Sequence, residues 1–197
     1  MFGIGKQRKT PPPKSAVPEK VLVLIDWDNF FLCLFNRFKK EIRIEWRIRE
    51  LLEWVKVEIG EILEGCGFVF APEHLNVFHQ EVCVNNNLVL FTCPKKKLQT
   101  PINNPKTGMP ETEVDTVDGT LMWFGRLMMK HPDVGFICLV AGDDDYVPLM
   151  EEAERMNIGR VLAPPTIDSL SRSKRLVRLV GRHPKTGKKM LLRLDTL

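Results

Sequence analysis

The sequence lacks the long apolar run that a transmembrane helix needs. Within its 197 residues no such run approaches the roughly 20 residues that span a bilayer, and the N-terminus lacks the apolar segment of a secretory signal. Internal repeats are also absent. The apolar fraction of 44% and the charged fraction of 27% are ordinary for a globular protein. We therefore expect one domain with tails, in a cytoplasmic protein that makes no membrane contact.

The cysteines lack the paired spacing of a metal or redox motif. No C-x-x-C pair occurs, the number is odd, and most of the cysteines lie inside apolar runs. This pattern disfavours a zinc site or a disulfide framework. We expect reduced thiols, mostly in the core, at Cys33, Cys66, Cys83, Cys93 and Cys138.

The net charge of +4 is small, but the charges are unevenly distributed. Basic residues gather near both ends of the chain and at Lys95, Lys96 and Lys97, whereas acidic residues gather in 111–118 and after two apolar runs. A mildly basic protein with an acidic centre suits a polyanion that is held at its edges and contacted through a metal ion. Simple solvation is the alternative explanation for the lysines.

Two apolar runs end in acidic residues. Residues 21–25 and 135–141 have the continuous apolar character of strands buried on both faces. Ligands of open parallel sheets bind outside the carboxyl ends of the strands. If these two strands are neighbours, we expect one set of polar residues, including one from the helix that starts near 115, to converge on a shared crevice: Asp26, Asp28, Asn29, Asp118, Asp143 and Asp145.

Apolar runs and helical periodicity alternate along the rest of the chain. Strands are expected at 20–26, 67–71, 88–93, 135–141 and 159–163, with helices at 30–38, 43–63, 73–82, 115–128, 146–156 and 167–173. This alternation predicts an α/β fold with a mainly parallel central sheet of about five strands and right-handed crossovers.

Three segments depart from this alternation. Residues 1–19 are basic and proline-rich and predict a flexible arm, so the domain is expected over 20–180. Residues 94–113 predict a long loop whose lysines are candidate phosphate contacts. Residues 181–197 form a basic extension, in which 182–189 could make a hairpin between 176–180 and 190–194. Nucleic-acid contacts are expected from six basic residues: Lys95, Lys96, Lys97, Arg172, Lys174 and Arg175.

Helix capping explains some of the acidic residues without any function. Asp28 or Asn29 is expected to cap the first helix, Asp145 the helix after residue 146, and Asp118 could interact with a helix dipole. Asp26 and Asp143 resist this explanation. Each is expected to end a buried strand, where an unpaired charge is costly.

The clustering of carboxylates predicts a metal ion. Two ionised carboxylates about 4 Å apart repel by roughly 4 kcal/mol at an effective dielectric near 20. Protonation, a basic partner or a divalent cation must compensate. No lysine or arginine adjoins these acids in the sequence, and oxygen ligands favour Mg²⁺ or Mn²⁺. The reaction class that follows is phosphodiester hydrolysis by a metal-activated water.

Three segments of the chain carry a family resemblance: I-D-W-D-N-F at 25–30, V-D at 117–118 and V-A-G-D-D-D-Y-V-P-L at 140–149. Together they resemble the NYN domain, the LabA-like branch of the PIN-like nuclease superfamily. The resemblance implies a Rossmann-like three-layer α/β/α sandwich and metal-dependent ribonuclease activity. It also implies that five side chains line the metal site: Asp26, Asn29, Asp118, Asp143 and Asp145. Asp115 stands where the family often has lysine, and Phe124 where it often has aspartate.

Two other functions remain open from the sequence. The same fold could serve as a non-catalytic RNA-binding or protein-interaction module, with salt-dependent binding through its basic residues. Alternatively, Asp26 and Asp28 could be the nucleophile and general acid of a haloacid-dehalogenase-type phosphatase, although Phe30 stands where that family usually has threonine or valine. The expected partner is RNA, with a single strand favoured, and a homo-oligomer is compatible with the sequence.

Overall fold

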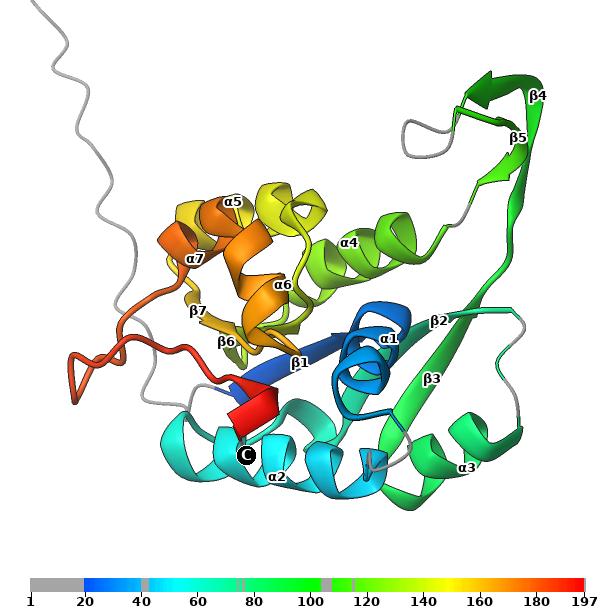
Figure 1. Ribbon diagram of the computed structural model, residues 1–197. Helices are drawn as coiled ribbons and strands as arrows, with labels where there is room; N and C mark the ends of the chain where they lie inside the picture. The colour runs from blue at the N-terminus through cyan, green and yellow to red at the C-terminus, as the bar shows by residue number, and fades with distance from the viewer. Residues whose placement is uncertain are drawn as a thin grey trace, which may run out of the picture.

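The computed structural model describes residues 20–39, 43–73, 75, 77–103, 108–114 and 116–196. The arm predicted at 1–19 and the family-divergent position Asp115 lie outside these residues. At the centre is a five-stranded parallel sheet with the order β3-β2-β1-β6-β7 (Figure 1). Its strands are β1 (Lys20–Asp26), β2 (Gly67–Pro72), β3 (Leu88–Cys93), β6 (Val134–Val140) and β7 (Gly159–Leu162).

The two apolar runs of the sequence are the central pair of this sheet. β1 pairs in parallel with β6, with Ile25 opposite Val140, and β6 is buried along its whole length. Strands covered on both faces tolerate apolar side chains at every position. The strand order reverses between β1 and β6, and this is where ligands of doubly wound sheets bind.

Helices cover both faces of the sheet, so the predicted three-layer α/β/α arrangement is confirmed (Figure 1). The helices between β1 and β3 are α1 (Trp27–Phe38), α2 (Ile44–Glu58) and α3 (Val77–Asn85), and those between β5 and β7 are α4 (Val117–Met128) and α5 (Val147–Arg155). α2 ends before the predicted residue 63, and a 3-10 turn (Leu63–Gly65) leads into β2. None of the described helices combines the length and apolar character needed to cross a bilayer.

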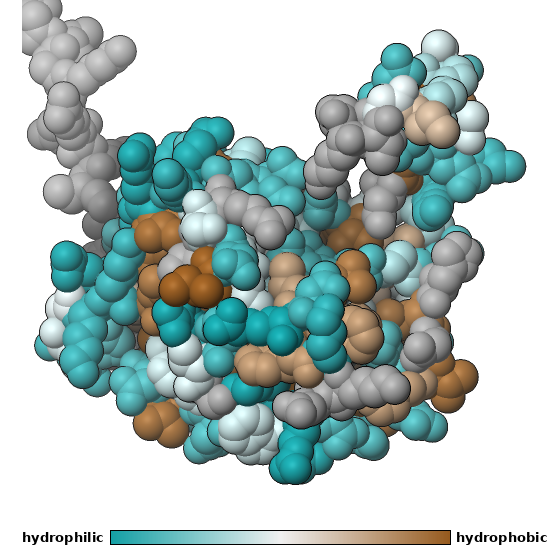
Figure 2. Space-filling view, in the orientation of Figure 1, coloured by the Kyte–Doolittle hydropathy of each residue, from teal (hydrophilic) through white to brown (hydrophobic). Residues whose placement is uncertain are grey.

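The predicted loop at 94–113 is wrong, because most of it forms a hairpin. β4 (Lys96–Asn103) pairs antiparallel with β5 (Pro110–Val114). The hairpin stands away from the central sheet (Figure 1), and its surface is largely hydrophilic (Figure 2). Proline suggested a loop, but both strands of a two-stranded ribbon are edge strands, where proline is tolerated.

The chain beyond β7 belongs to the folded domain. α6 (Ile167–Arg172) and α7 (Lys174–Leu179) follow the strand, so the strand predicted at 176–180 is a helix instead. The predicted basic turn is present, with Arg182 bridged to Lys189. The tail then returns to β7, where Leu192 N donates to Leu162 O at 3.0 Å. The domain therefore extends past Val180, the boundary expected from the sequence.

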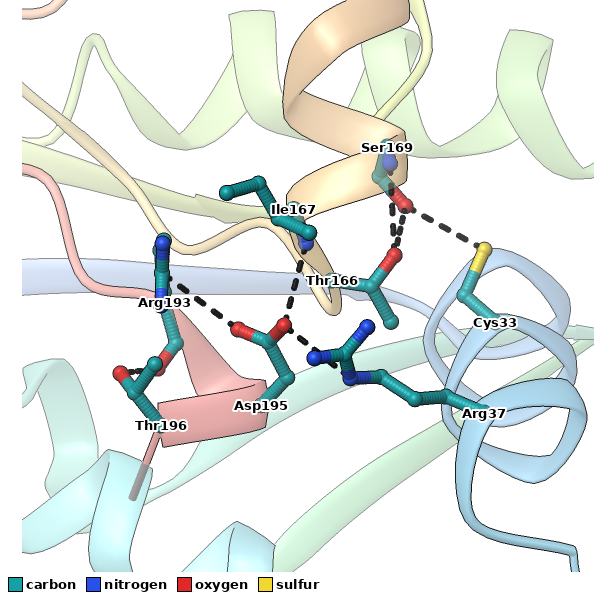
Figure 3. Close-up of polar contacts among 8 residues, drawn as sticks. All are labelled: Cys33, Arg37, Thr166, Ile167, Ser169, Arg193, Asp195 and Thr196. Atoms are coloured by element: carbon teal, nitrogen blue, oxygen red, sulfur yellow. Dashed lines mark hydrogen bonds and ion pairs between the residues drawn. The ribbon is translucent and has the colours of Figure 1, made fainter.

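A buried carboxylate fastens this tail to the domain (Figure 3). Asp195, in the last 3-10 turn (Leu194–Thr196), has a side chain with 0% exposure. It lies 3.3 Å from Arg37 Nε and 3.5 Å from Arg193 Nε, and it accepts a hydrogen bond from Ile167 N at 3.2 Å. The side chain thus joins the C-terminal tail to α1 and α6.

The cysteines are free thiols, as predicted. Cys83, Cys93 and Cys138 are buried, and Cys33 and Cys66 are half-buried. Burial raises the pKa of the Cys138 thiol to about 12 and that of Cys83 to about 11. A thiol with such a pKa is a small apolar side chain at neutral pH and is unreactive.

Candidate active site

Asp26 is the buried carboxylate at the end of β1. Its side chain accepts a hydrogen bond from Asn29 N at 3.1 Å, so Asp26 itself caps α1. Asp28 or Asn29 was predicted as the cap, but the helix begins at Trp27, directly after the strand. Burial raises the pKa of Asp26 to about 7; the Asn29 and Tyr146 hydrogen bonds oppose this, and Asp118 and Asp28 add to it.

A tyrosine hydroxyl connects Asp26 to a second carboxylate. Tyr146 is 0% exposed, and its Oη lies 2.8 Å from Asp26 Oδ2 and 2.5 Å from Asp118 Oδ1. Asp118 lies in the first turn of α4 and is otherwise exposed. Burial raises the pKa of Tyr146 far above its usual value, and both carboxylates raise it further. The hydroxyl therefore stays neutral and donates.

The three oxygens need one more proton than the tyrosine provides. A phenol hydroxyl carries a single hydrogen, so it donates to only one of the two carboxylates. Both short contacts are hydrogen bonds when one carboxyl is protonated. Asp26 is suited to hold this proton near neutral pH, because burial disfavours its charged form. The pair thus carries excess negative charge that a proton or a cation must balance.

Asn29 joins the ends of the two central strands. Its side-chain Oδ1 accepts a hydrogen bond from Gly142 N at 2.9 Å, two residues after β6 ends. The resemblance implied a metal ligand at this position; the contact in the structure is to backbone. Asn29 therefore holds the β6 loop beside the end of β1, next to Asp26.

Gly142 allows α6 to pack directly against this loop. A Cβ on Gly142 would lie 2.3 Å from Ser169 Cβ and 3.2 Å from Ser169 Cα, which is too close for any side chain. The Ser173 hydroxyl lies within hydrogen-bond distance of two carbonyl oxygens, Gly142 O and, at 2.9 Å, Ser169 O. The loop that precedes Asp143 is thus held on both sides, by α1 and by α6.

Asp143 and Asp145 lie in this loop and are exposed. Asp143 accepts a hydrogen bond from Asp145 N at 3.2 Å and caps a 3-10 turn (Asp144–Tyr146). Asp145 was predicted to cap α5, but Tyr146 occupies that position. The expectation that Asp143 is a buried charge is also wrong: β6 ends at Val140, and after the buried Ala141 and Gly142 the chain is exposed at Asp143.

The predicted residues meet only in part. Asp26 and Asp118 share the Tyr146 hydroxyl, and Asp143 and Asp145 follow the neighbouring strand at the same edge of the sheet. Over the described part of the chain, no group of three or more histidine, cysteine, aspartate or glutamate residues is arranged to hold a metal ion. The carboxylates thus form one bridged pair and a separate exposed turn.

Sequence reasoning missed the role of Tyr146. Two signals could have indicated it: this is the only tyrosine in the chain, and it directly follows the acidic run that ends at Asp145. Phe124, where the family often has aspartate, has a core role instead. Its ring packs 4.9 Å from that of Phe68 and 5.0 Å from that of Phe91, measured between centroids.

The predicted nucleic-acid contacts fall on three parts of the fold: the base of the β4–β5 hairpin, α6 and α7. Lys95, Lys96 and Lys97 are exposed at the base of the β4–β5 hairpin, where the Thr116 hydroxyl donates to Pro94 O at 2.6 Å. This bond lies just before the helix that carries Asp118. Lys174 and Arg175 are exposed on α7, and Arg172 lies in α6.

Comparison with known proteins supports the fold but does not indicate a function. Neither protein-family models nor curated proteins match the sequence. The fold is similar to that of a crystal structure of a protein of unknown function from Vibrio parahaemolyticus. The TM-score is 0.60 at 14% sequence identity, over 93% of this chain and 97% of that one. The likeness therefore covers the whole domain.

Proposed function

We propose that the protein is a metal-dependent ribonuclease whose site lies at the C-terminal ends of β1 and β6. The observation that carries the proposal is the pair of carboxylates, Asp26 and Asp118, held on the Tyr146 hydroxyl at 2.8 and 2.5 Å. They lie where the strand order of the sheet reverses, which is the ligand-binding position of this architecture.

The donor set suits a hard divalent cation. The oxygens of Asp26 and Asp118 come from different elements and carry more negative charge than one shared proton neutralises. Mg²⁺ is commonly bound through one or two carboxylates together with water and substrate phosphates, so a bridged pair is sufficient. Asp26 and Asp118 would hold such an ion, or Mn²⁺, which would supply charge stabilisation to a phosphate during hydrolysis. Asp143 and Asp145 remain accessible at the same edge to orient water or a second ion.

RNA is the substrate class favoured by the surface and by the sequence. Exposed lysines at the hairpin base and on α7 offer contacts to a polyanion on elements adjoining the site. The segments at 25–30, 117–118 and 140–149 resemble those of NYN-domain ribonucleases. Asn29, one of the residues that carry this resemblance, holds the Gly142 loop in place.

Gel-resolved cleavage of an end-labelled single-stranded RNA tests the proposal. We expect products from the wild type with Mn²⁺ or Mg²⁺, none with excess EDTA, and none from Asp26→Asn or Asp143→Asn. Asp144→Asn is the matched control, because it lies in the same turn and keeps the oxygen that accepts a long hydrogen bond from Leu176 N, at 3.4 Å. Asp144→Asn should cleave like the wild type.

Two results would contradict the proposal in different ways. Unchanged turnover by both Asp26→Asn and Asp143→Asn would remove the assigned site while leaving a nuclease. A folded wild type that binds RNA but gives no product with either metal ion would replace the ribonuclease with a non-catalytic RNA-binding module.

A further inference from the structure

A surface hollow of about 400 Å³ lies on α6 and α7. The described residues that line it are Ile167, Ser171, Lys174, Val177 and Arg178. Its volume is within the range of small-molecule pockets, which begins at about 300 Å³. Ile167 and Ser171 are four residues apart on α6, and Lys174 and Arg178 are four apart on α7. Each helix therefore presents one face to the hollow.

The two helices are tied to the loop of the candidate active site. The Ser173 hydroxyl, between α6 and α7, donates to Gly142 O. Leu176 N, in α7, lies 3.4 Å from Asp144 Oδ1. The hollow is therefore on the pair of helices that supports residues 142–144, and neither Asp26 nor Asp118 is among its described lining residues.

The lining combines aliphatic surface with two cations. Ile167 is 42% exposed, and Val177 is half-buried beside it. None of the described lining residues is acidic, and among the ion pairs of the described residues none involves Lys174 or Arg178. A suitable ligand thus combines an apolar part with at least one negative charge, as a nucleotide does.

We propose that this hollow is a nucleotide subsite for single-stranded RNA. The base lies against Ile167 and Val177, and the adjoining phosphates pair with Lys174 and Arg178. Bases of single strands are free to stack on side chains, and arginine can add both charge and a planar surface. The identity of the ligand rests on the proposed ribonuclease function, but the subsite itself binds in the absence of metal.

Binding of a fluorescent single-stranded RNA in EDTA tests the phosphate contacts. The double variant Lys174→Gln/Arg178→Gln should bind at least about tenfold more weakly, and its plot of log K against log salt should be less steep by about 1.4, which is about 0.7 for each lost phosphate contact. The matched control is Lys56→Gln/Lys130→Gln, which removes the same charge from α2 and from the turn after α4. It should keep the salt slope of the wild type.

The base contact has its own readout. Ile167→Ala should weaken binding of the RNA several-fold, because the base loses its contact with the isoleucine side chain. An abasic oligonucleotide of the same length has no base to make this contact, so its binding should not change. Equal weakening of both ligands would overturn the base contact. Competition with polyglutamate gives a second check. If polyglutamate displaces the fluorescent RNA as effectively as an unlabelled RNA of equal charge, the base contact is overturned and the hollow is assigned to an acidic protein segment.

The cleavage assay separates this inference from the proposed function. If the wild type cleaves RNA and Lys174→Gln/Arg178→Gln has a KM raised at least about tenfold with little change in kcat, both the ribonuclease function and the subsite are supported. Cleavage with an unchanged KM and salt slope overturns the subsite alone. RNA binding that depends on Lys174 and Arg178, without any cleavage, overturns the ribonuclease alone.

Discussion

The hydroxyl of Tyr146 lies 2.8 Å from a carboxylate oxygen of Asp26, although the two residues are 120 positions apart in the chain. Asp26 ends the central strand, and Tyr146 precedes α5, which follows the neighbouring strand β6. Their contact places a neutral donor between Asp26 and the more exposed Asp118. Five predictions test this arrangement and the loop and tail that hold it.

The free energy of unfolding should depend on the proton of Asp26. Burial raises the pKa of this carboxyl from an ordinary 3.8 to about 7 in the folded protein, so between these values the folded state binds more protons than the unfolded state. The contribution of Asp26 to stability is therefore full at acidic pH and is lost as the pH rises through this window, and it changes no further above it. The metal-free protein should lose of order 2–4 kcal/mol across the window.

Asp26→Asn should remove this pH dependence and stabilise the metal-free protein above about pH 7. The asparagine keeps the oxygen that caps α1, and its amide can donate to Tyr146 as the protonated acid does. Denaturant titrations in EDTA at several pH values measure the effect, with Asp144→Asn as the surface control. A variant that retains the slope of the wild type would contradict the pKa assigned to Asp26.

Tyr146→Phe should destabilise the protein by about 1–3 kcal/mol, because it leaves a buried carboxylate oxygen without its hydrogen-bond partner. The Tyr146 hydrogen bond lowers the pKa of Asp26. Its loss should therefore extend the decline in stability to higher pH, because only the pKa of the folded state changes. The same titrations give both quantities, and an unchanged upper limit of the decline would show that the hydroxyl does not hold the Asp26 charge.

Gly142→Ala should destabilise the protein by roughly 1–3 kcal/mol, because the new Cβ would lie 2.3 Å from Ser169 Cβ. Combining it with Ser169→Gly should recover part of the loss, since the clashing atoms are removed and the two effects are not additive. Gly119→Ala is the control: its Cβ meets nothing within 4 Å, and alanine favours the helix. Thermal unfolding distinguishes these variants, and purely additive losses would contradict the close packing of α6 on the loop.

Asp195→Asn should lower the free energy of unfolding by about 1–3 kcal/mol, because it removes a buried charge that lies between Arg37 and Arg193. The cost is moderated by the partial exposure of both arginines. Asp168→Asn, on the exposed surface of α6, should change it by less than about 0.5 kcal/mol. Equal values for the two variants would mean that the tail is held by apolar packing alone.

The sequence was sufficient for the central strands and insufficient for the hairpin. Residues 21–25 and 135–141 are apolar without interruption, and only strands covered on both faces at this spacing explain them. Residues 94–113 have no such constraint, since both strands of the β4–β5 ribbon are exposed edges. Where no side chains are buried, the secondary-structure prediction depends mainly on proline and glycine. These residues occur both in loops and in exposed edge strands, so they do not distinguish a hairpin from a loop.

The candidate site divides in the same way. The sequence by itself determined that carboxylates follow two buried strands, because a strand buried in a sheet ends where its apolar run ends. Only the tertiary structure decided which of them meet: Asp118 reaches Asp26 through Tyr146, whereas Asp143 turns into solvent. Periodicity reports the burial of one element at a time. The distance between side chains on α4, β1 and the loop after β6 depends on how those elements pack, and no local pattern encodes it.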